Sequence, residues 1–250
     1  MLFLPSIVYS QEFTKAIEDN SFFIEEAYNQ EEGVIQHIFN GTIISPENEW
    51  ESSFTEEWPL LSQLHQLSVT IPYHFSTLTN TPSNSIGDVQ INYRYEVLNE
   101  KGLAIAPRGT IILPTGNPSK HSGYGKTGFQ FNLPVSKRFS NEFVMHYNAG
   151  WTYIPNVRWK SGSAAFSEYI FGASAIYLAN PHFNLLTEIL FRSSGTTFDR
   201  SNELIISPGV RWAIDIGDLQ IVPGFAYSVY FIEGSEIRGF FFYLSFEHSY

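Results

Sequence analysis

The sequence contains no cysteine and few basic residues. Without cysteine, disulfide frameworks, cysteine-ligated zinc sites, iron–sulfur clusters and thiol nucleophiles are all excluded. The chain has 14 Lys and Arg residues and 25 Asp and Glu residues, so the formal net charge is -11. Because binding to a phosphate backbone requires a basic surface, this balance argues against nucleic acid as a partner.

Charged side chains and long apolar runs are also scarce. Charged residues make up 16% of the 250 residues, below the roughly 25% of ordinary soluble domains. No apolar run reaches the roughly 18 residues of a transmembrane helix. Aromatic residues are abundant, with 22 Phe, 14 Tyr and 5 Trp. The membrane class that fits this combination is the β-barrel, in which lipid-facing apolar residues alternate with polar ones.

Residues 1–10 (MLFLPSIVYS) are apolar and contain small residues that suit cleavage by a signal peptidase. The alternative is a buried first strand, but the polar sequence that follows would not cover one. We therefore predict a signal-peptide remnant over 1–10, a periplasmic or lumenal plug segment over 11–32 and a β-barrel over 33–250. Export in a Gram-negative bacterium follows from this reading.

From about residue 64 onward, apolar side chains occupy every second position. Leu67, Val69 and Ile71 alternate with Ser68 and Thr70, for example. A strand shows its two faces at period two, so one face is apolar and the other polar. Similar stretches lie near 89–97, 129–135, 143–153, 183–191, 219–229 and 240–246, and less regular ones near 34–43, 49–58, 103–114, 164–178 and 203–215. The pattern predicts an all-β fold, a transmembrane antiparallel up-and-down β-barrel of about twelve strands.

The connections between these strands are predicted to alternate in length. Short turns are expected at 99–102, 140–141, 180–181 and 217–218, and longer polar loops at 76–86, 115–126, 155–163 and 193–202. Outer-membrane barrels have this asymmetry, with short periplasmic turns and long extracellular loops. An even number of strands places both termini on the periplasmic side. A soluble lipocalin-like barrel is the alternative, but its apolar face would have to fill a much smaller interior.

The chain ends on FFFYLSFEHSY, in which Phe242, Leu244 and Phe246 alternate toward a terminal Tyr250. This ending resembles the signal that outer-membrane proteins present to the barrel assembly machinery. His248 departs from the pattern, because an apolar residue is more usual there. We therefore expect the bacterial outer membrane as the location, with its lipid and the assembly machinery as partners.

Three stretches carry a resemblance to a known family. They are GDVQINYRY (87–95), APRGTIILPTG (106–116), and GKTGFQFNLPVSKRFS leading into HYNAGWTY (125–153). These stretches resemble outer-membrane proteins named for the meta-pathway of phenol degradation and described as transporters. The family commonly has an acidic residue after PTG, where this chain has Asn117. The resemblance implies a barrel with a transporter role and implies little about the substrate.

Motifs for covalent chemistry are weak. His74 and Ser76 have the His-x-Ser spacing of an outer-membrane phospholipase, but alternation turns both away from the lipid on which such an enzyme acts. The stretch 123–127 lacks the first glycine of a phosphate-binding loop, since Lys120 stands there. The seven histidines show no paired metal spacing. The sequence therefore predicts no enzyme, no metal and no cofactor.

Several charged residues fall on the face predicted to point inward. Charges are costly in hydrocarbon, so we expect them to line a polar lumen. The predicted lumen-lining residues are Asp88, Arg94, Glu96, Arg108, Glu188, Arg192 and Arg211. Two readings remain open at this point. The residues either form two facing charge clusters that select solutes, or they neutralise each other inside a closed interior.

Residues 12–32 are acidic and aromatic without regular alternation. So many aromatic residues argue against a disordered tail. The segment is either a periplasmic tail or a short helix that enters the lumen with Phe22, Phe23 and Tyr28 on one side. The carboxylates that would then compensate the lumenal arginines are Glu18, Asp19, Glu25 and Glu26.

The function that these observations favour is an outer-membrane channel or transporter for passive passage of small solutes, aromatic or hydrophobic ones among them. Two other functions stay open. One is a plugged barrel that does not conduct and has a structural role. The other is a lipid-hydrolysing enzyme, which would need a nucleophile and a base facing the bilayer.

Overall fold

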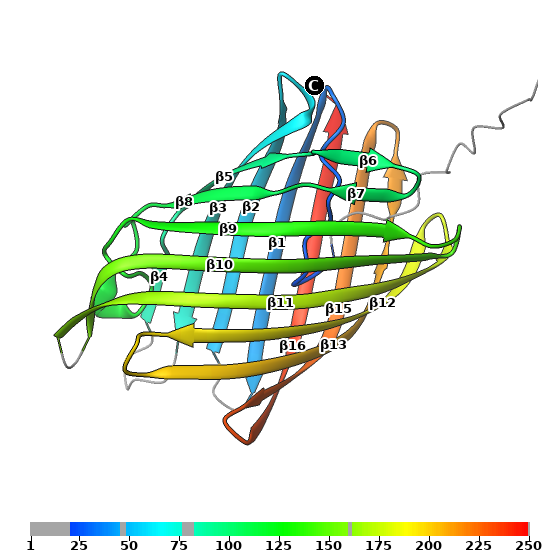
Figure 1. Cartoon of the computed structure of the whole chain (residues 1–250). Coiled ribbons are helices and arrows are strands. Elements are labelled where there is room, and N and C mark those ends of the chain that lie inside the picture. The colour runs from blue at the N-terminus through cyan, green and yellow to red at the C-terminus, as the bar shows by residue number, and fades with distance from the viewer. Residues whose placement is uncertain (1–20, 46–48, 77–82, 160–161, 250) are drawn as a thin grey trace, which may run out of the picture.

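The chain forms one antiparallel sheet that is rolled into a barrel (Figure 1). The computed structural model describes residues 21–45, 49–76, 83–159 and 162–249. The strands are β1 (Val34–Ser45), β2 (Glu49–Leu60), β3 (Ser62–Ser76), β4 (Ser83–Ile86), β5 (Gln90–Tyr95), β6 (Leu98–Glu100), β7 (Leu103–Ile105), β8 (Arg108–Ile112), β9 (Gly128–Arg138), β10 (Phe143–Trp159), β11 (Gly162–Asn180), β12 (Phe183–Gly195), β13 (Arg200–Trp212), β14 (Ile214–Ile216), β15 (Leu219–Ile232) and β16 (Ser235–Ser249). A short 3-10 helix, η1 (Pro118–Lys120), lies in the connection between β8 and β9.

The barrel closes because its first and last strands pair. β1 runs antiparallel to β16, from Val34 opposite Ser249 to Ser45 opposite Arg238. β4, β5 and β6 lie end to end, as do β7 with β8 and β13 with β14, so the barrel has twelve strands. This confirms the predicted transmembrane barrel and its strand number. We call the end where β1 begins and β16 finishes the terminus end, and the opposite end the loop end.

Strand alternation sorts the side chains between the two faces of the wall. On β5, Ile91, Tyr93 and Tyr95 are exposed on the outer face, whereas Asn92 and Arg94 are buried inside. The same division runs around the sheet, because a strand turns successive side chains to opposite faces. The outer face is therefore apolar, as a lipid-facing surface requires.

Two of the predicted long loops are strand instead. β10 continues to Trp159 and β11 starts at Gly162, so most of 155–163 is paired, and only residues 196–199 separate β12 from β13. A register shift between Ile154 and Val157, with Asn156 at φ 51, lets β10 continue through polar sequence. Among the described connections, the longest at the loop end is 113–127.

No helix forms in residues 21–32, contrary to the expectation of a short helix there. These residues contain bends, and their backbone N–H groups bond to barrel side chains rather than to each other. The predicted signal remnant over 1–10 and the acidic Glu18 and Asp19 lie outside the described residues. Within the described ranges, no helix is long and apolar enough to cross a membrane.

The barrel interior differs from one side to the other. Along β10 to β16, inward side chains such as Ile176, Leu186 and Phe241 form an apolar cluster. Along β1 to β5, most inward side chains are polar, from small ones such as Thr55 and Ser68 to the larger Arg94. A uniformly polar lumen was expected, so the apolar side is a correction. It exists because a segment from outside the sheet packs against it.

Candidate functional site

Residues 21–30, here called the lumenal segment, lie among the inward side chains of the barrel. The backbone N–H groups of Phe22, Phe23 and Ile24 all donate to the carboxylate of Glu188, with N–O distances between 3.0 and 3.1 Å. Further along, the Ala27 N–H donates to Ser136 Oγ at 2.7 Å. Side chains from several strands thus replace the hydrogen bonds that an extended segment cannot form by itself.

Inward-facing glycines make room for the apolar residues of this segment. A Cβ atom on Gly172 would lie 2.3 Å from Ile24, and one on Gly209 would lie 2.5 Å from the Phe22 ring. Gly224 is similar, with 2.8 Å to the same ring. At these distances a side chain larger than hydrogen would force the lumenal segment to shift, so β11, β13 and β15 are shaped around it.

The two acidic residues of the segment form ion pairs with inward arginines. Glu26 Oε1 lies 3.1 Å from Arg94 Nη1, and each side chain is only 4% exposed. Arg108 Nε donates to Glu25 Oε2 at 2.9 Å. Arg94 also donates to Asn29 and to the Tyr28 carbonyl oxygen. The carboxylates that pair with these arginines therefore come from the segment, while Gln66, Asn92 and Gln130 on the barrel strands accept further hydrogen bonds from them.

The remaining predicted lumen-lining residues have separate partners. Arg192 on β12 bonds to Glu203 at 2.9 Å and lies 3.6 Å from Glu168. Glu96 accepts hydrogen bonds from Asn99 beside it. Arg211 is fully buried on the inner face of β13. Of the two readings left open by the sequence, facing charge clusters or mutual neutralisation, neither describes Arg94, Arg108 and Glu188 in full, because all three contact the lumenal segment.

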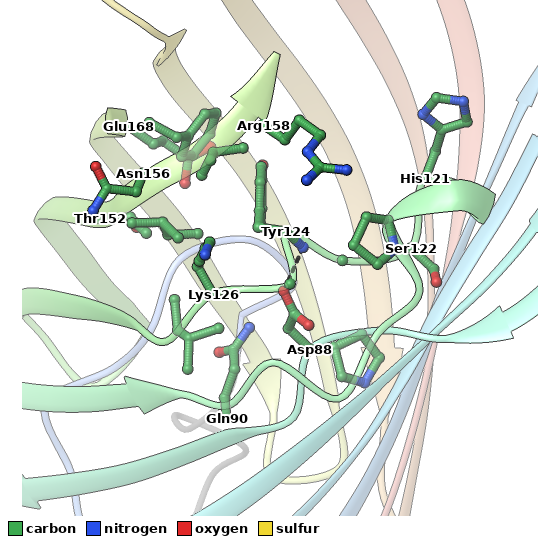
Figure 2. Close-up of a pocket in the computed structure, with 18 of the residues that line it drawn as sticks. Asp88, Gln90, His121, Ser122, Tyr124, Lys126, Thr152, Asn156, Arg158 and Glu168 are labelled. Atoms are coloured by element: carbon green, nitrogen blue, oxygen red, sulfur yellow. Dashed lines mark hydrogen bonds between the residues drawn. The ribbon is translucent and has the colours of Figure 1, made fainter. Parts of the chain in front are cut away.

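Asp88 holds the connection 113–127 rather than a lumenal arginine. Its Oδ1 accepts from the Gly116 N–H at 2.9 Å and its Oδ2 from the Tyr124 N–H at 2.8 Å, a contact visible in Figure 2. A Cβ atom on Gly123 would lie 2.5 Å from Asp88 Oδ1. The carboxylate therefore fastens this connection at the mouth of the barrel.

Replacing Asp88 by Ala should release this connection. Two backbone N–H groups would lose a charged acceptor, which costs about 1–3 kcal/mol for each buried group left unsatisfied. Trypsin should then cut after Lys120 or Lys126 faster than in the parent barrel. Asp215→Ala, which alters an exposed carboxylate at the terminus end, is the matched control. Equal cleavage rates in all three proteins would contradict the assigned role.

A cavity of about 740 Å³ opens at the loop end beneath this connection (Figure 2). One wall is apolar and aromatic, with Tyr124 and Phe166 rings 4.7 Å apart beside Ile154. The opposite wall is polar and includes His74, which lies 3.3 Å from Glu51. Burial raises the pKa of the Tyr124 phenol, so it stays neutral. We call this cavity the vestibule.

A second cavity of about 240 Å³ lies deeper, between the lumenal segment and the β1 to β5 wall. Gln90 lines both cavities, so its side chain lies at the boundary between them. Arg94 and Arg108 line the deeper cavity together with Glu25 and Glu26. Polar side chains therefore follow a line from the vestibule past Gln90 to the ion pairs of the lumenal segment, and we call this line the polar route.

The other residues singled out in the sequence lie on the outer face or at the vestibule wall. Phe242 and Leu244 lie on the outer face of β16, as does Phe246 by alternation, and Tyr250 lies outside the described residues. His74 lines the vestibule and so faces away from lipid. In the part of the chain that the structure describes, no group of three or more His, Cys, Asp or Glu residues is arranged to hold a metal ion.

A family model described as "Putative MetA-pathway of phenol degradation" matches residues 47–236. The chain belongs to this family. The phenol-degradation family was the resemblance drawn from residues 87–153, so that prediction is confirmed. Family membership and the twelve-stranded barrel place the protein in the bacterial outer membrane.

Solved structures similar to this family member are outer-membrane barrels. The COG4313 outer membrane channel from Pseudomonas putida F1 has a TM-score of 0.67 at 11% identity, over 90% of this chain and 98% of that one. The NanC porin has a TM-score of 0.58 at 11% identity, over 84% of this chain and 98% of that one. The KdgM porin has a TM-score of 0.55 at 8% identity, over 86% of this chain and 99% of that one. At such identities the likeness shows the fold. No curated protein sequence gives a significant match.

Some residues of the site in this member of the phenol-degradation family were not predicted from the sequence. Gln90, Tyr124 and Phe166 carry no motif and come together only through barrel closure. A signal did exist for the lumenal segment, because Gly172 and Gly209 occupy inward positions of otherwise regular strands. A glycine in a strand interior often marks close approach of another backbone or ligand.

Proposed function

We propose that this protein is an outer-membrane channel for passive passage of small solutes, with aromatic and other hydrophobic compounds as the preferred class. The observation that carries this proposal is the route formed by two cavities that share Gln90. A solute would enter the vestibule at the loop end, pass Gln90 and reach the lumenal segment. Similar barrels are described as channels or porins, which supports the general role.

The wall chemistry of the vestibule supports the solute class. Tyr124, Phe166 and Trp159 offer ring faces in the vestibule, and Gln130 and Thr152 beside them offer hydrogen-bonding groups. An aromatic ring with one polar substituent could satisfy both walls, because rings stack in offset or edge geometry while the substituent bonds across the cavity. A fully polar solute would leave the aromatic wall uncovered.

The alternative of a barrel that does not conduct also has a specific observation behind it. Phe22 and Ile24 fill the space beside Gly172, Gly209 and Gly224 without a gap. If the segment stays fixed, the route would end at the ion pairs of Glu25 and Glu26. Conductance of the intact chain distinguishes these two functions.

Single-channel recording in planar bilayers tests the proposal. The intact chain should conduct, and phenol added on the loop side should interrupt the current whereas glycerol at equal concentration should not. Gln90→Trp should reduce the conductance several-fold, because the indole would obstruct the junction between the cavities. Phe166→Ser should shorten the interruptions by phenol, because it removes a ring from the vestibule wall.

Asn202→Trp provides the matched control, since this exposed β13 residue lies near the loop end on the outer face. It should leave the conductance unchanged. An intact chain without conductance would favour the structural barrel. Interruptions that are the same for phenol and glycerol would reject the aromatic solute class while leaving the channel role in place.

A further inference from the structure

Three ionisable side chains lie together on the outer face of the barrel near the terminus end. They are His248 on β16, His37 on β1 and Glu56 on β2. In the strand register His37 lies opposite both Phe246 and Glu56, on the face that carries the exposed Phe39. An ionisable group on a lipid-facing surface is costly, so it is by default a candidate functional site. Neither the vestibule nor the lumenal segment involves these residues.

The hydrogen-bond partners of the two imidazoles indicate where their protons lie. His248 Nδ1 is 3.0 Å from the Ser249 carbonyl oxygen, which can only accept, so this nitrogen carries a proton. His37 Nδ1 is 3.6 Å from Glu56 Oε2, and the carboxylate favours a proton there as well. Both Nε2 atoms then present lone pairs to each other at 3.2 Å. Two facing lone pairs repel at this distance, so the pair is held together either by a proton on one of the two nitrogens or by a metal ion between them.

We propose that His37 and His248 bind a divalent transition metal ion of the Zn²⁺ type at the seam between β1 and β16. Two nitrogen ligands on tetrahedral Zn²⁺, each at about 2.0–2.1 Å, are separated by roughly 3.3 Å, close to the observed distance. Glu56 would orient His37 through its Nδ1, the carboxylate–histidine–metal arrangement of many metal sites. Water completes the coordination, so the site is weaker than a closed four-ligand zinc site.

The surroundings of His248 favour a cation. A cavity of about 230 Å³ at the terminus end is lined by His248 together with Glu31, Asp215, Asp218 and Glu247. Carboxylates concentrated in one cavity raise the local cation concentration. Imidazole ligands in turn select Zn²⁺, Cu²⁺ or Ni²⁺ over Mg²⁺ or Ca²⁺. The ion would join the first strand of the barrel to the last.

Calorimetric titration of the refolded full chain with Zn²⁺, prepared without a polyhistidine tag, tests this site. One Zn²⁺ should bind per barrel. His37→Ala and His248→Phe should each abolish binding, and Glu56→Gln should weaken it by about 10-fold or more. At free Zn²⁺ about 100 times above Kd, the equilibrium between folded and unfolded chain should shift about 100-fold toward the folded barrel.

His182→Ala is the matched control, because His182 also lies at the terminus end and faces a carboxylate, Asp215, at 3.3 Å. It should leave Zn²⁺ binding intact. A shift in gel mobility on boiling confirms that each variant has folded. If a histidine variant does not fold, His37→Asn is measured in its place. Absence of Zn²⁺ binding by the intact barrel, or binding that survives both histidine substitutions, would overturn the proposal. The pair would then share a proton instead of a metal.

Discussion

Deletion of residues 21–30 should raise single-channel conductance several-fold and shift the ion preference toward anions. The deleted segment fills one side of the lumen and carries Glu25 and Glu26, which compensate Arg108 and Arg94. Without these carboxylates the constriction becomes basic, and charges in a confined lumen act more strongly than on a solvated surface. Reversal potentials in a salt gradient measure the ion preference.

A disulfide lock supplies the control for this deletion. Ser21 Oγ donates to Ser174 Oγ at 2.8 Å, so the double variant Ser21→Cys and Ser174→Cys brings two sulfur atoms within bonding reach. The chain has no native cysteine, so no other disulfide can form. The oxidised lock should keep the parental conductance. A deletion that changes neither conductance nor ion preference would show that the barrel's own side chains close the lumen.

Replacement of Arg94 by Met should destabilise the protein by about 3–5 kcal/mol, the cost of leaving a buried charge without its partner. Glu26 would lose its guanidinium, and Asn29 and the Tyr28 carbonyl would lose hydrogen bonds. Gln66, which also accepts from Arg94, would lose a further contact. Guanidinium chloride unfolding of the refolded barrel measures the loss, and proteolysis reports whether the lumenal segment is released.

Arg238→Met is the comparison that isolates burial. Arg238 lies 2.7 Å from Glu236, a shorter distance than in the buried pair, but the two side chains are 63% and 45% exposed. Its loss should leave the free energy of unfolding nearly unchanged, because solvent screens an exposed ion pair. Adding Glu26→Gln to Arg94→Met should recover part of the stability, because the uncompensated carboxylate disappears. If both arginine substitutions had equal, small effects, the lumenal segment would contribute little to folding.

The prediction of a long loop over residues 155–163 was wrong, because the strands continue through this polar sequence. Residues 155–163 contain Pro155, Asn156, Lys160 and Gly162, which are typical of a loop, yet most of the stretch is paired. Backbone pairing with β11 supplies the hydrogen bonds, and the register shift near Asn156 absorbs the irregularity. A change to polar sequence indicates where the strand leaves the hydrocarbon zone of the membrane. The strand itself can continue beyond that point.

For the charged residues, the face of the strand was predictable but the interaction partners were not. Arg94 and Arg108 were predicted to face inward from alternation alone, and both line the deeper cavity. Their partners were not predictable in detail, because Glu25 and Glu26 belong to a segment without periodicity. Asp88 was predicted only to line the lumen, whereas its carboxylate also accepts backbone N–H groups from a connection about 30 residues further along the chain.

The sequence by itself determined the barrel class, the approximate strand number and the face of each strand residue. These properties follow from period-two alternation, which is local and survives in any register that keeps the apolar face outward. The tertiary structure alone decided which polar groups meet, where the lumenal segment runs and which residues line the two cavities. Glu188 and Phe22 are 166 residues apart, and Gly172 approaches Ile24 only once the sheet has closed. Such contacts depend on closure, which no local pattern encodes.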